Sequence, residues 1–323
     1  MERIAGQKIM KHILITGGAG FIGSQLTDYF LKKKYEVTVI DNLSWGKEEF
    51  ISHNFSSPKF NFIKLDLLNK KLVDKLFPLN IDTVFHLAAN SDIKRGVDNP
   101  ETDFKYTTKT TFNVLEIMRK NNIKKIFYTS GSGVYGDVGE KYTTESYGPL
   151  LPASMYGATK LSAEAMISAY VNLFEFQAWI LRPANIIGPR ATHGVIYDFI
   201  NKLKRDPTQL HILGDGKQSK SYLYVDDVIK AIDLVWSKTN DKINLFNIAS
   251  NSFITVTEIA EIIIHEMNLK NTKLIYSGGS IGWIGDVPIV RIDNSKINKL
   301  KWNSKHTSTE AVEKTVKFLL RKE

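Results

Sequence analysis

Two side chains in the middle of the chain could move a proton together. Tyr156 and Lys160 are four positions apart, and on a helix this spacing places them on one face, one turn apart. A phenol is protonated near neutral pH, but a neighbouring ammonium group stabilises the phenolate and lowers the pKa of the phenol. Tyr156 could then act as a general base that takes a proton from a hydroxyl group, while a hydride leaves the same carbon.

A glycine-rich turn near the start of the chain could bind the acceptor of such a hydride. Gly17, Gly20 and Gly23 are spaced GxxGxxG, after a strand-like run and at the start of a helical one. In such a turn the first glycine permits the tight bend, the second lets the backbone approach a pyrophosphate, and the third allows close packing of helix and strand. Phe21 and Ile22 would supply amide donors at the helix start. The turn predicts a dinucleotide site.

An acidic residue follows at the expected distance. The second strand-like run ends at Asp41, 18 residues after Gly23, and Asn42 comes next. A carboxylate there would accept hydrogen bonds from the adenosine ribose and repel a 2′-phosphate, which favours NAD over NADP. The positive nicotinamide ring would help Lys160 to lower the pKa of Tyr156. An ordinary turn with a solvated acid is the alternative, but the order of strand, glycines, helix and acid favours the cofactor site.

The first half of the chain alternates short β-branched runs with longer amphipathic ones, which predicts a parallel sheet with crossover helices. The runs are largely apolar, so both faces of the sheet should be covered, as in a Rossmann-type doubly wound α/β fold. The predicted strands are 12–16, 36–40, 60–65, 83–87, 125–130 and 178–182, and predicted helices include 21–33, 102–121 and 155–174.

After Pro183 the pattern becomes less regular, which predicts a smaller mixed α/β region that binds the substrate. We therefore expect an NAD-binding domain at 10–183 that carries the Tyr-Lys pair, and a substrate-binding region at 184–323 packed against it as one body. Residues 1–9 are interpreted as a leader. The shorter units of the second region are 194–205, 221–238, 243–249, 255–268 and 306–320.

Composition excludes several classes of function. The chain has no cysteine, and its seven histidines are scattered, so no metal site is predicted. The net charge of +9 comes from lysines spread along the chain without interleaved aromatic residues, so nucleic acid is not the expected partner, although a basic surface would attract an anionic nucleotide. No apolar run approaches the roughly 20 residues that span a bilayer, and no signal sequence is visible, so we expect a cytoplasmic protein without membrane contact.

Two further motifs complete a family pattern. His86-Leu87-Ala88-Ala89 and Gly133-Val134-Tyr135-Gly136, together with the glycine turn, Asp41 and the Tyr-Lys pair, resemble the extended short-chain dehydrogenase/reductase family, in particular its NAD-dependent nucleotide-sugar epimerases and dehydratases such as UDP-glucose 4-epimerases. The resemblance runs from about residue 11 to the C-terminus. It implies a homodimer with a four-helix interface formed by the helices near 102–121 and 155–174.

The resemblance also implies roles for individual residues. Lys160 should bind the nicotinamide ribose, and the substrate should be a nucleotide-diphosphate sugar. Further cofactor contacts are implied for Asp66, Leu67, Ala88, Ala89 and Pro183, and substrate contacts for Asn185 and Lys220 at the diphosphate and for His211 and Leu213 at the nucleobase.

The sequence departs from the family at the hydroxyl that holds the reacting sugar oxygen. Many relatives carry Ser or Thr four residues before the tyrosine of the VYG motif, where this chain has Gly131. Ser130 or Ser132 could supply the hydroxyl, and we expect Ser132 to do so. Related dehydratases carry proton-transfer residues at the positions of Ser132 and Gly133, and neither residue suits that role. Dehydration is therefore the less favoured chemistry, although Glu145 or His193 could supply a proton from elsewhere.

A second departure concerns the substrate pocket. Trp283 stands three residues before Asp286, where relatives commonly have an arginine that clamps the diphosphate. An indole cannot form a bidentate phosphate pair, but it could stack on a base or a sugar. Arg190 and His193 lie where a substrate pocket would form. These positions do not decide whether the nucleotide of the substrate is UDP or GDP.

The predicted reaction is NAD-dependent oxidation of the C4 hydroxyl of a UDP- or GDP-linked hexose or heptose to a 4-keto sugar. Return of the hydride to the other face would make the enzyme a 4-epimerase, and release of the keto sugar would make it a 4-dehydrogenase. A nucleotide-sugar dehydratase and a non-catalytic NAD-binding module are the alternatives.

Overall fold

Seven parallel strands form the central sheet of the computed structural model, which describes residues 11–77 and 80–321. The strand order is β12-β7-β5-β4-β1-β2-β3, so the order reverses between β1 and β4. In doubly wound sheets a ligand binds at this reversal, outside the carboxyl ends of the strands. The strands are β1 (His12–Thr16), β2 (Glu36–Asp41), β3 (Phe60–Lys64), β4 (Thr83–His86), β5 (Lys125–Thr129), β7 (Gln177–Pro183) and β12 (Ile243–Ile248).

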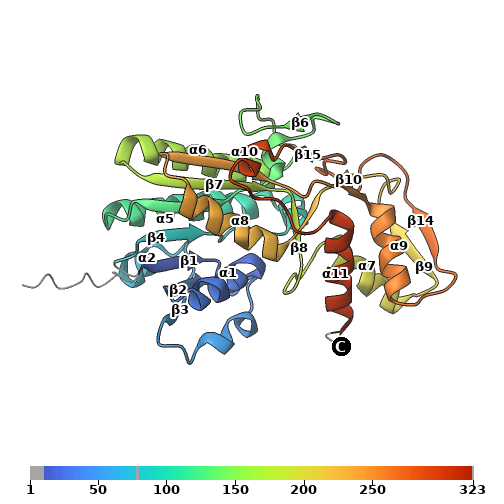
Figure 1. Ribbon diagram of the computed structural model, residues 1–323, viewed down its shortest axis with the longest axis horizontal. Coiled ribbons are helices and arrows are strands. Elements are labelled where there is room, and N and C mark those ends of the chain that lie inside the picture. Colours follow the sequence, from blue (N-terminus) through green and yellow to red (C-terminus); the bar gives the residue numbers. More distant parts are fainter. Residues whose placement is uncertain (1–10, 78–79, 322–323) are drawn as a thin grey trace, which may run out of the picture.

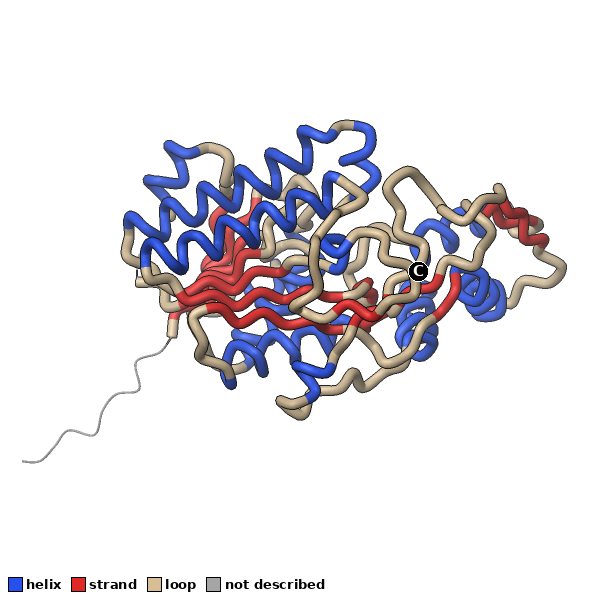
Figure 2. Tube along the Cα trace, turned by 90° about the horizontal axis from the view of Figure 1, so that it is seen from above, coloured by secondary structure: helices blue, strands red, loops and turns tan. Residues whose placement is uncertain are grey.

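Helices cover both faces of the sheet, as Figure 2 shows. One apolar core joins α1 (Phe21–Lys32) and α8 (Val225–Lys238) to one face. A second core joins α5 (Thr110–Lys120) and α6 (Met155–Phe174) to the other. The inner strands can therefore be largely apolar, since helices cover both faces of the sheet, whereas the edge strand β3 has exposed residues. The fold class predicted from the sequence is confirmed.

The six predicted strands are present, but the predicted helix 102–121 is not continuous. It consists of α4 (Pro100–Asp103), a π-helical segment η3 (Phe104–Lys109) and α5. The Thr110 hydroxyl donates to the carbonyl oxygen of Lys105, five residues earlier, over 3.0 Å. This bond accompanies the wider turn, which no periodicity in the sequence announces.

The sheet does not end where the sequence analysis divided the chain. Strand β12 and helix α8 both follow Pro183, yet β12 pairs with β7 along six residues and α8 packs on the sheet face. The predicted boundary after Pro183 therefore does not coincide with the edge of the sheet layer. Residues 1–9, the predicted leader, lie outside the described residues.

A smaller lobe stands beside the sheet layer (Figure 1) and has its own apolar core. In this lobe α7 (Val195–Arg205), α9 (Val256–Glu266) and α11 (Ser308–Arg321) pack together, and β9 (Gln209–Ile212) pairs with β14 (Lys273–Tyr276). The remaining elements are η1 (Glu48–Phe50), η2 (Ser52–Asn54), α2 (Lys70–Leu76), α3 (Ile93–Asp98), η4 (Ser132–Tyr135), β6 (Tyr142–Thr143), β8 (Asn185–Ile187), β10 (Ser219–Lys220), β11 (Tyr222–Tyr224), β13 (Ile254–Thr255), β15 (Arg291–Ile292) and α10 (Ser295–Asn298).

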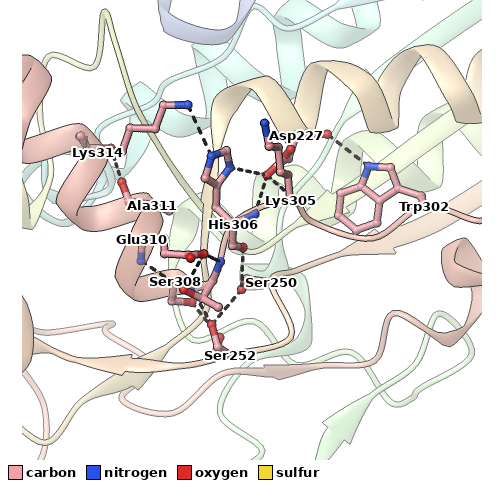
Figure 3. Close-up of polar contacts among 12 residues, drawn as sticks. Asp227, Ser250, Ser252, Trp302, Lys305, His306, Ser308, Glu310, Ala311 and Lys314 are labelled. Carbon is pink, nitrogen blue, oxygen red and sulfur yellow. Dashed lines mark hydrogen bonds and ion pairs between the residues drawn. The ribbon is translucent and has the colours of Figure 1, made fainter.

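A polar cluster ties the lobe to the sheet layer (Figure 3). The buried carboxylate of Asp227, in the first turn of α8, accepts from the backbone amides of Lys305 and His306 over 3.0 and 3.3 Å. The same oxygen lies 3.1 Å from the His306 ring nitrogen Nδ1. Because residues 305 and 306 lead directly into α11, this cluster sets the position of a lobe helix against a sheet helix.

Within the part of the chain that the structure describes, no helix is both long enough and apolar enough to span a membrane.

Candidate active site

A cleft of about 1170 Å³ runs from the carboxyl edge of the sheet into the lobe. Its sheet side is built by the glycine turn and by residues that follow β2, β4 and β5, and its lobe side by α7 and residues 282–287. The cleft therefore lies at the strand-order reversal, where the fold predicts a ligand.

The glycine turn is shaped by close backbone approaches. Gly17 adopts a left-handed φ of +71°, and a Cβ there would lie 2.7 Å from the amide nitrogen of Ala88. A Cβ on Gly23 would overlap the carbonyl oxygen of Gly17. Gly20 is the N-cap of α1 and no side chain caps this helix start. The first backbone amides of α1 therefore have no side-chain acceptor at the N-cap and can donate to an anionic group in the cleft. A pyrophosphate is an anion of this kind.

Asp41 lies at the carboxyl end of β2 and lines the cleft. Its carboxylate accepts from the amides of Ala19 and Leu43 over 3.0 and 2.8 Å, and burial raises its pKa. These two bonds orient the carboxylate and leave acceptor positions for two ribose hydroxyls. The residues of the turn and Asp41 fit the adenosine half of NAD.

The other predicted cofactor residues line the same cleft. Asp66 closes its own turn by accepting from the amide of Leu68 over 2.8 Å. The carbonyl of Leu67 accepts from Asn113 over 2.8 Å, which fixes this segment against α5. The predicted residues that the structure brings together here are Gly17, Gly20, Phe21, Ile22, Gly23, Asp41, Asn42, Asp66, Leu67, Ala88, Ala89, Tyr156, Lys160 and Pro183.

His86 is the last residue of β4 and lies buried beneath the cleft. Its ring is fully buried between the hydroxyls of Thr16 and Thr111, at 2.7 and 3.0 Å. Burial, followed by the charge of Lys160, lowers its pKa to about 3, so the imidazole is neutral at neutral pH. This residue links β4 to β1 and α5.

Tyr156 and Lys160 lie in the first turns of α6, as predicted, because Ser154 caps the helix by accepting from the amide of Gly157 over 3.2 Å. Lys160 is 5% exposed, and its ammonium donates to the carbonyl oxygen of Thr129 over 2.8 Å. The ammonium lies 5.7 Å from the centre of the Tyr156 ring. Burial lowers the pKa of Lys160 to about 8, opposed by the charges of Glu164 and Asp103.

The pKa of Tyr156 in the protein alone lies above its usual value. Burial and then the charge of Asp103 raise it to about 12. The predicted lowering of this pKa by Lys160 together with the positive nicotinamide stays a prediction.

A buried ion pair behind the Tyr-Lys pair was not anticipated from the sequence. Glu164, one turn after Lys160 on α6, accepts from Nε and Nη2 of Arg182 on β7. Both side chains are less than a tenth exposed. Arg182 also donates to the hydroxyl of Tyr135 over 3.0 Å, which donates to Asn247 over 2.7 Å. The i,i+4 spacing of Lys160 and Glu164 was a visible signal, but its partner lies on another element.

Gly131 faces the hydroxyl of Tyr156. A Cβ at this position would lie 3.6 Å from the hydroxyl oxygen of Tyr156. The position where relatives carry a hydroxyl side chain therefore does adjoin Tyr156, and this chain has no side chain there. Ser132, at the start of η4, is half-buried and lines the cleft. Its role as a replacement hydroxyl stays a prediction.

On the lobe side the structure brings together most of the predicted substrate residues. The Lys220 ammonium lies 2.6 Å from a carboxylate oxygen of Asp286, and both side chains are largely buried. The lysine is thus held in the cleft wall by Asp286 instead of lying in solvent. The predicted residues that line this side are Asn185, His193, Leu213, Lys220, Trp283 and Asp286.

Two predicted substrate residues lie elsewhere. Arg190 has a left-handed φ of +68° and pairs with Asp28 of α1 over 2.8 Å, in a separate surface pocket. His211 is exposed on β9, whose alternating burial turns its side chain away from the cleft that Leu213 lines. Neither residue is among those that line the cleft, so the structure does not bring them together with the other predicted substrate residues. Strand alternation and a backbone reversal decide these placements, and neither is visible in a short motif.

The described residues contain no group of three or more His, Asp or Glu side chains placed to hold a metal ion.

A Rossmann-type sheet with a Tyr-Lys pair at its carboxyl edge and a nucleotide cleft defines a class of dinucleotide-dependent enzymes. The profile described as the NAD dependent epimerase/dehydratase family matches residues 13–249. The chain belongs to this family, and NAD is its cofactor.

Relatives agree with this assignment. The chain is 33% identical over 312 residues to a putative UDP-glucose 4-epimerase of Methanocaldococcus jannaschii, covering 95% of this chain and 98% of that one. It is 32% identical over 266 residues to UDP-glucuronic acid decarboxylase 1 of Arabidopsis thaliana, covering 80% of this chain and 58% of that one. A crystal structure of a UDP-galactose 4-epimerase superposes with a TM-score of 0.85 at 36% identity, covering 96% and 99%.

Proposed function

We propose that the protein is a 4-epimerase of a UDP-linked sugar and oxidises the sugar transiently at C4. The observation that carries the proposal is the position of Tyr156. Its hydroxyl lies in the cleft next to Gly131, which has no side chain, and the ammonium of the buried Lys160 lies 5.7 Å from the centre of its ring. Relatives whose names include UDP-glucose 4-epimerase support the choice of reaction and nucleotide.

Tyr156 takes the proton of the C4 hydroxyl and later returns it. The glycine turn and Asp41 would hold NAD, which would supply the acceptor for the C4 hydride and the donor that returns it to the opposite face of the keto sugar. Lys160, anchored on the Thr129 carbonyl, has two further N–H donors for the nicotinamide ribose. Its positive charge, together with that of the cofactor, opposes the burial that otherwise keeps Tyr156 protonated.

Lobe residues position the substrate. Lys220 and Asn185 are the proposed partners of the diphosphate, and Leu213 and Trp283 offer apolar surface to the base or sugar. Asp286 holds the Lys220 ammonium at 2.6 Å, which fixes the cation in place before a ligand binds. A 4-dehydrogenase would use the same residues and differ only in releasing the keto sugar. Dehydration is not favoured, because Ser132 and Gly133 offer no acid or base beside the sugar.

Assembly and location belong to the same proposal. We propose a homodimer that pairs the sheet-side helices α5 and α6, whose outer surfaces expose Phe112 (44%) and Leu173 (70%). A cytoplasmic location fits a chain without cysteine.

The test is a product assay with NAD and UDP-glucose, UDP-galactose and their N-acetyl counterparts, in wild type and in two matched Tyr→Phe variants. Tyr156→Phe should lower kcat by about 10²–10⁴-fold, the usual contribution of a general base. Tyr128→Phe should stay within about twofold, because the Tyr128 hydroxyl is buried and has no hydrogen-bond partner among the described residues. Full activity in Tyr156→Phe would contradict the mechanism. A keto product in place of an epimer would identify the 4-dehydrogenase.

A further inference from the structure

Trp283 differs from the other four tryptophans of the chain. Each of those has a ring contact or an indole hydrogen bond within the fold: Trp45, Trp179, Trp236 and Trp302. Within residues 11–77 and 80–321, no ring, cation or hydrogen-bond acceptor holds the indole of Trp283, which lies half-buried in the cleft wall. An indole is large and apolar and carries one N–H donor, so an indole without internal partners in a cleft is suited to bind a ligand.

Trp283 lies in a short turn, residues 282–286, whose shape is fixed by Asp286. The amide of Asp286 donates to the Trp283 carbonyl oxygen over 3.0 Å, and the amide of Gly282 donates to one carboxylate oxygen of Asp286 over 3.3 Å. The other carboxylate oxygen accepts from the Lys220 ammonium over 2.6 Å. Asp286 therefore holds both the turn and the cation proposed for the diphosphate, so the indole has a defined place beside that cation.

One end of the turn lies at the part of the cleft predicted for the nucleobase. A Cβ on Gly282 would lie 3.7 Å from the carbonyl oxygen of Leu213 and 3.6 Å from the side-chain nitrogen of Gln218. That nitrogen also donates to the Leu213 carbonyl over 3.1 Å. The Gly282 end of the turn is thus attached to the lobe.

The other end of the turn reaches across the cleft to helix α6. A Cβ on Gly285 would lie 3.4 Å from the carbonyl oxygen of Ala153 and 3.5 Å from the Cβ of Ser154, which is the N-cap of α6. Tyr156 follows two residues later on this helix. The same Cβ would lie 3.6 Å from Cζ3 of Trp283, an atom of the six-membered ring. The indole is therefore turned toward the end of the cleft where Tyr156 lies.

We propose that the indole of Trp283 packs against the apolar face of the sugar ring and determines how much the sugar adds to substrate binding. A sugar ring presents C–H groups between its hydroxyls, and a flat apolar ring removes them from water. The diphosphate is left to Lys220, because an indole carries no charge and cannot pair with phosphate. This inference rests on the proposed function and assigns Trp283 to the sugar, where that proposal left the base and the sugar as alternatives.

The experiment measures the Kd of UDP, UDP-glucose and UDP-galactose by isothermal titration calorimetry. The protein is loaded with NAD and carries Tyr156→Phe, so that the sugars bind without being converted. The Kd of UDP divided by the Kd of a UDP-sugar gives the contribution of the sugar. Adding Trp283→Ala should lower this ratio about two- to tenfold, the usual value of an aromatic contact, and leave the Kd of UDP within twofold. Adding Trp283→Phe, which keeps a flat apolar ring, should retain most of the ratio.

The variant Trp283→Arg separates the sugar from the diphosphate. A guanidinium offers phosphate a bidentate partner, so this variant should bind UDP at least threefold more tightly and show the same low sugar ratio as Trp283→Ala. Tyr142→Ala serves as the control, because this aromatic side chain is 59% exposed and lies outside the cleft lining. It should leave every Kd unchanged.

Weaker UDP binding in Trp283→Ala with an unchanged sugar ratio would place the indole at the nucleobase and would overturn the inference. Unchanged Kd values for all three ligands would overturn it as well. A lower Tm together with weaker NADH binding in Trp283→Ala would show that the indole supports the fold, with the same consequence. Conversion of UDP-galactose by the Tyr156→Phe protein would instead refute the proposed function, and the Kd ratios would report on Trp283 independently of it.

Discussion

The substitution Glu164→Gln removes one charge from the buried pair behind the Tyr-Lys helix. Glu164 accepts from Nε and Nη2 of Arg182, and both side chains are less than a tenth exposed. Removing one partner of a buried pair leaves an uncompensated charge, which typically costs about 3–5 kcal/mol of unfolding free energy. The same change withdraws the charge that most opposes the burial of Lys160, so the pKa of Lys160 should fall below its value of about 8.

The first assay is thermal unfolding followed by circular dichroism. An unfolding entropy of about 2.1 cal/mol/K per residue gives roughly 0.7 kcal/mol/K for a chain of 323 residues, so the expected loss lowers Tm by about 4–7 °C. The control is Glu101→Gln, which breaks an exposed pair of 2.9 Å with Lys105 on the surface. Exposed pairs of this kind contribute about 0–1 kcal/mol, so its Tm should change by less than 2 °C.

The second assay is the pH dependence of kcat/KM. A lower pKa of Lys160 means that the ammonium is lost at lower pH, so the alkaline limb of the profile should move toward neutrality in Glu164→Gln and stay in place in Glu101→Gln. Equal melting temperatures for the two variants would refute the view that the buried Glu164–Arg182 ion pair stabilises the fold. An unmoved alkaline limb would refute the coupling to Lys160.

Three further outcomes follow from the site. The neutral His86 has a folded pKa of about 3, below its unfolded value of about 6.5. The unfolded state therefore binds a proton first, and the unfolding free energy should fall as pH drops from about 6.5 toward 3; urea titrations should show a shallower fall in His86→Gln. Gly23→Ala, whose Cβ overlaps the Gly17 carbonyl, should weaken NADH binding at least tenfold in a fluorescence titration, and more than Gly20→Ala, whose Cβ would sit 3.2 Å from the same oxygen; equal affinities would contradict the packing role. Lys220→Met should weaken UDP binding at least tenfold in calorimetry without changing NADH affinity, and unchanged UDP affinity would remove Lys220 from the diphosphate site.

Local patterns determined the nucleotide-binding half of the site. The glycine turn, Asp41 and the Tyr-Lys pair are defined by spacings within one or two elements, and strand and helix periodicity fix the direction of each side chain. The structure places all of these residues around one cleft. The departure from the family at Gly131 was also visible in the sequence. That Gly131 lies next to the Tyr156 hydroxyl was not.

Only the tertiary structure decided which residues meet across the chain. Lys220 pairs with Asp286 and Glu164 with Arg182 between separate elements, while Arg190 turns to Asp28 and His211 to the surface. Strand β12 returns to the sheet from the far side of the predicted boundary. Such placements depend on how whole elements pack and on the hand of a single backbone turn, and a short stretch of sequence carries neither.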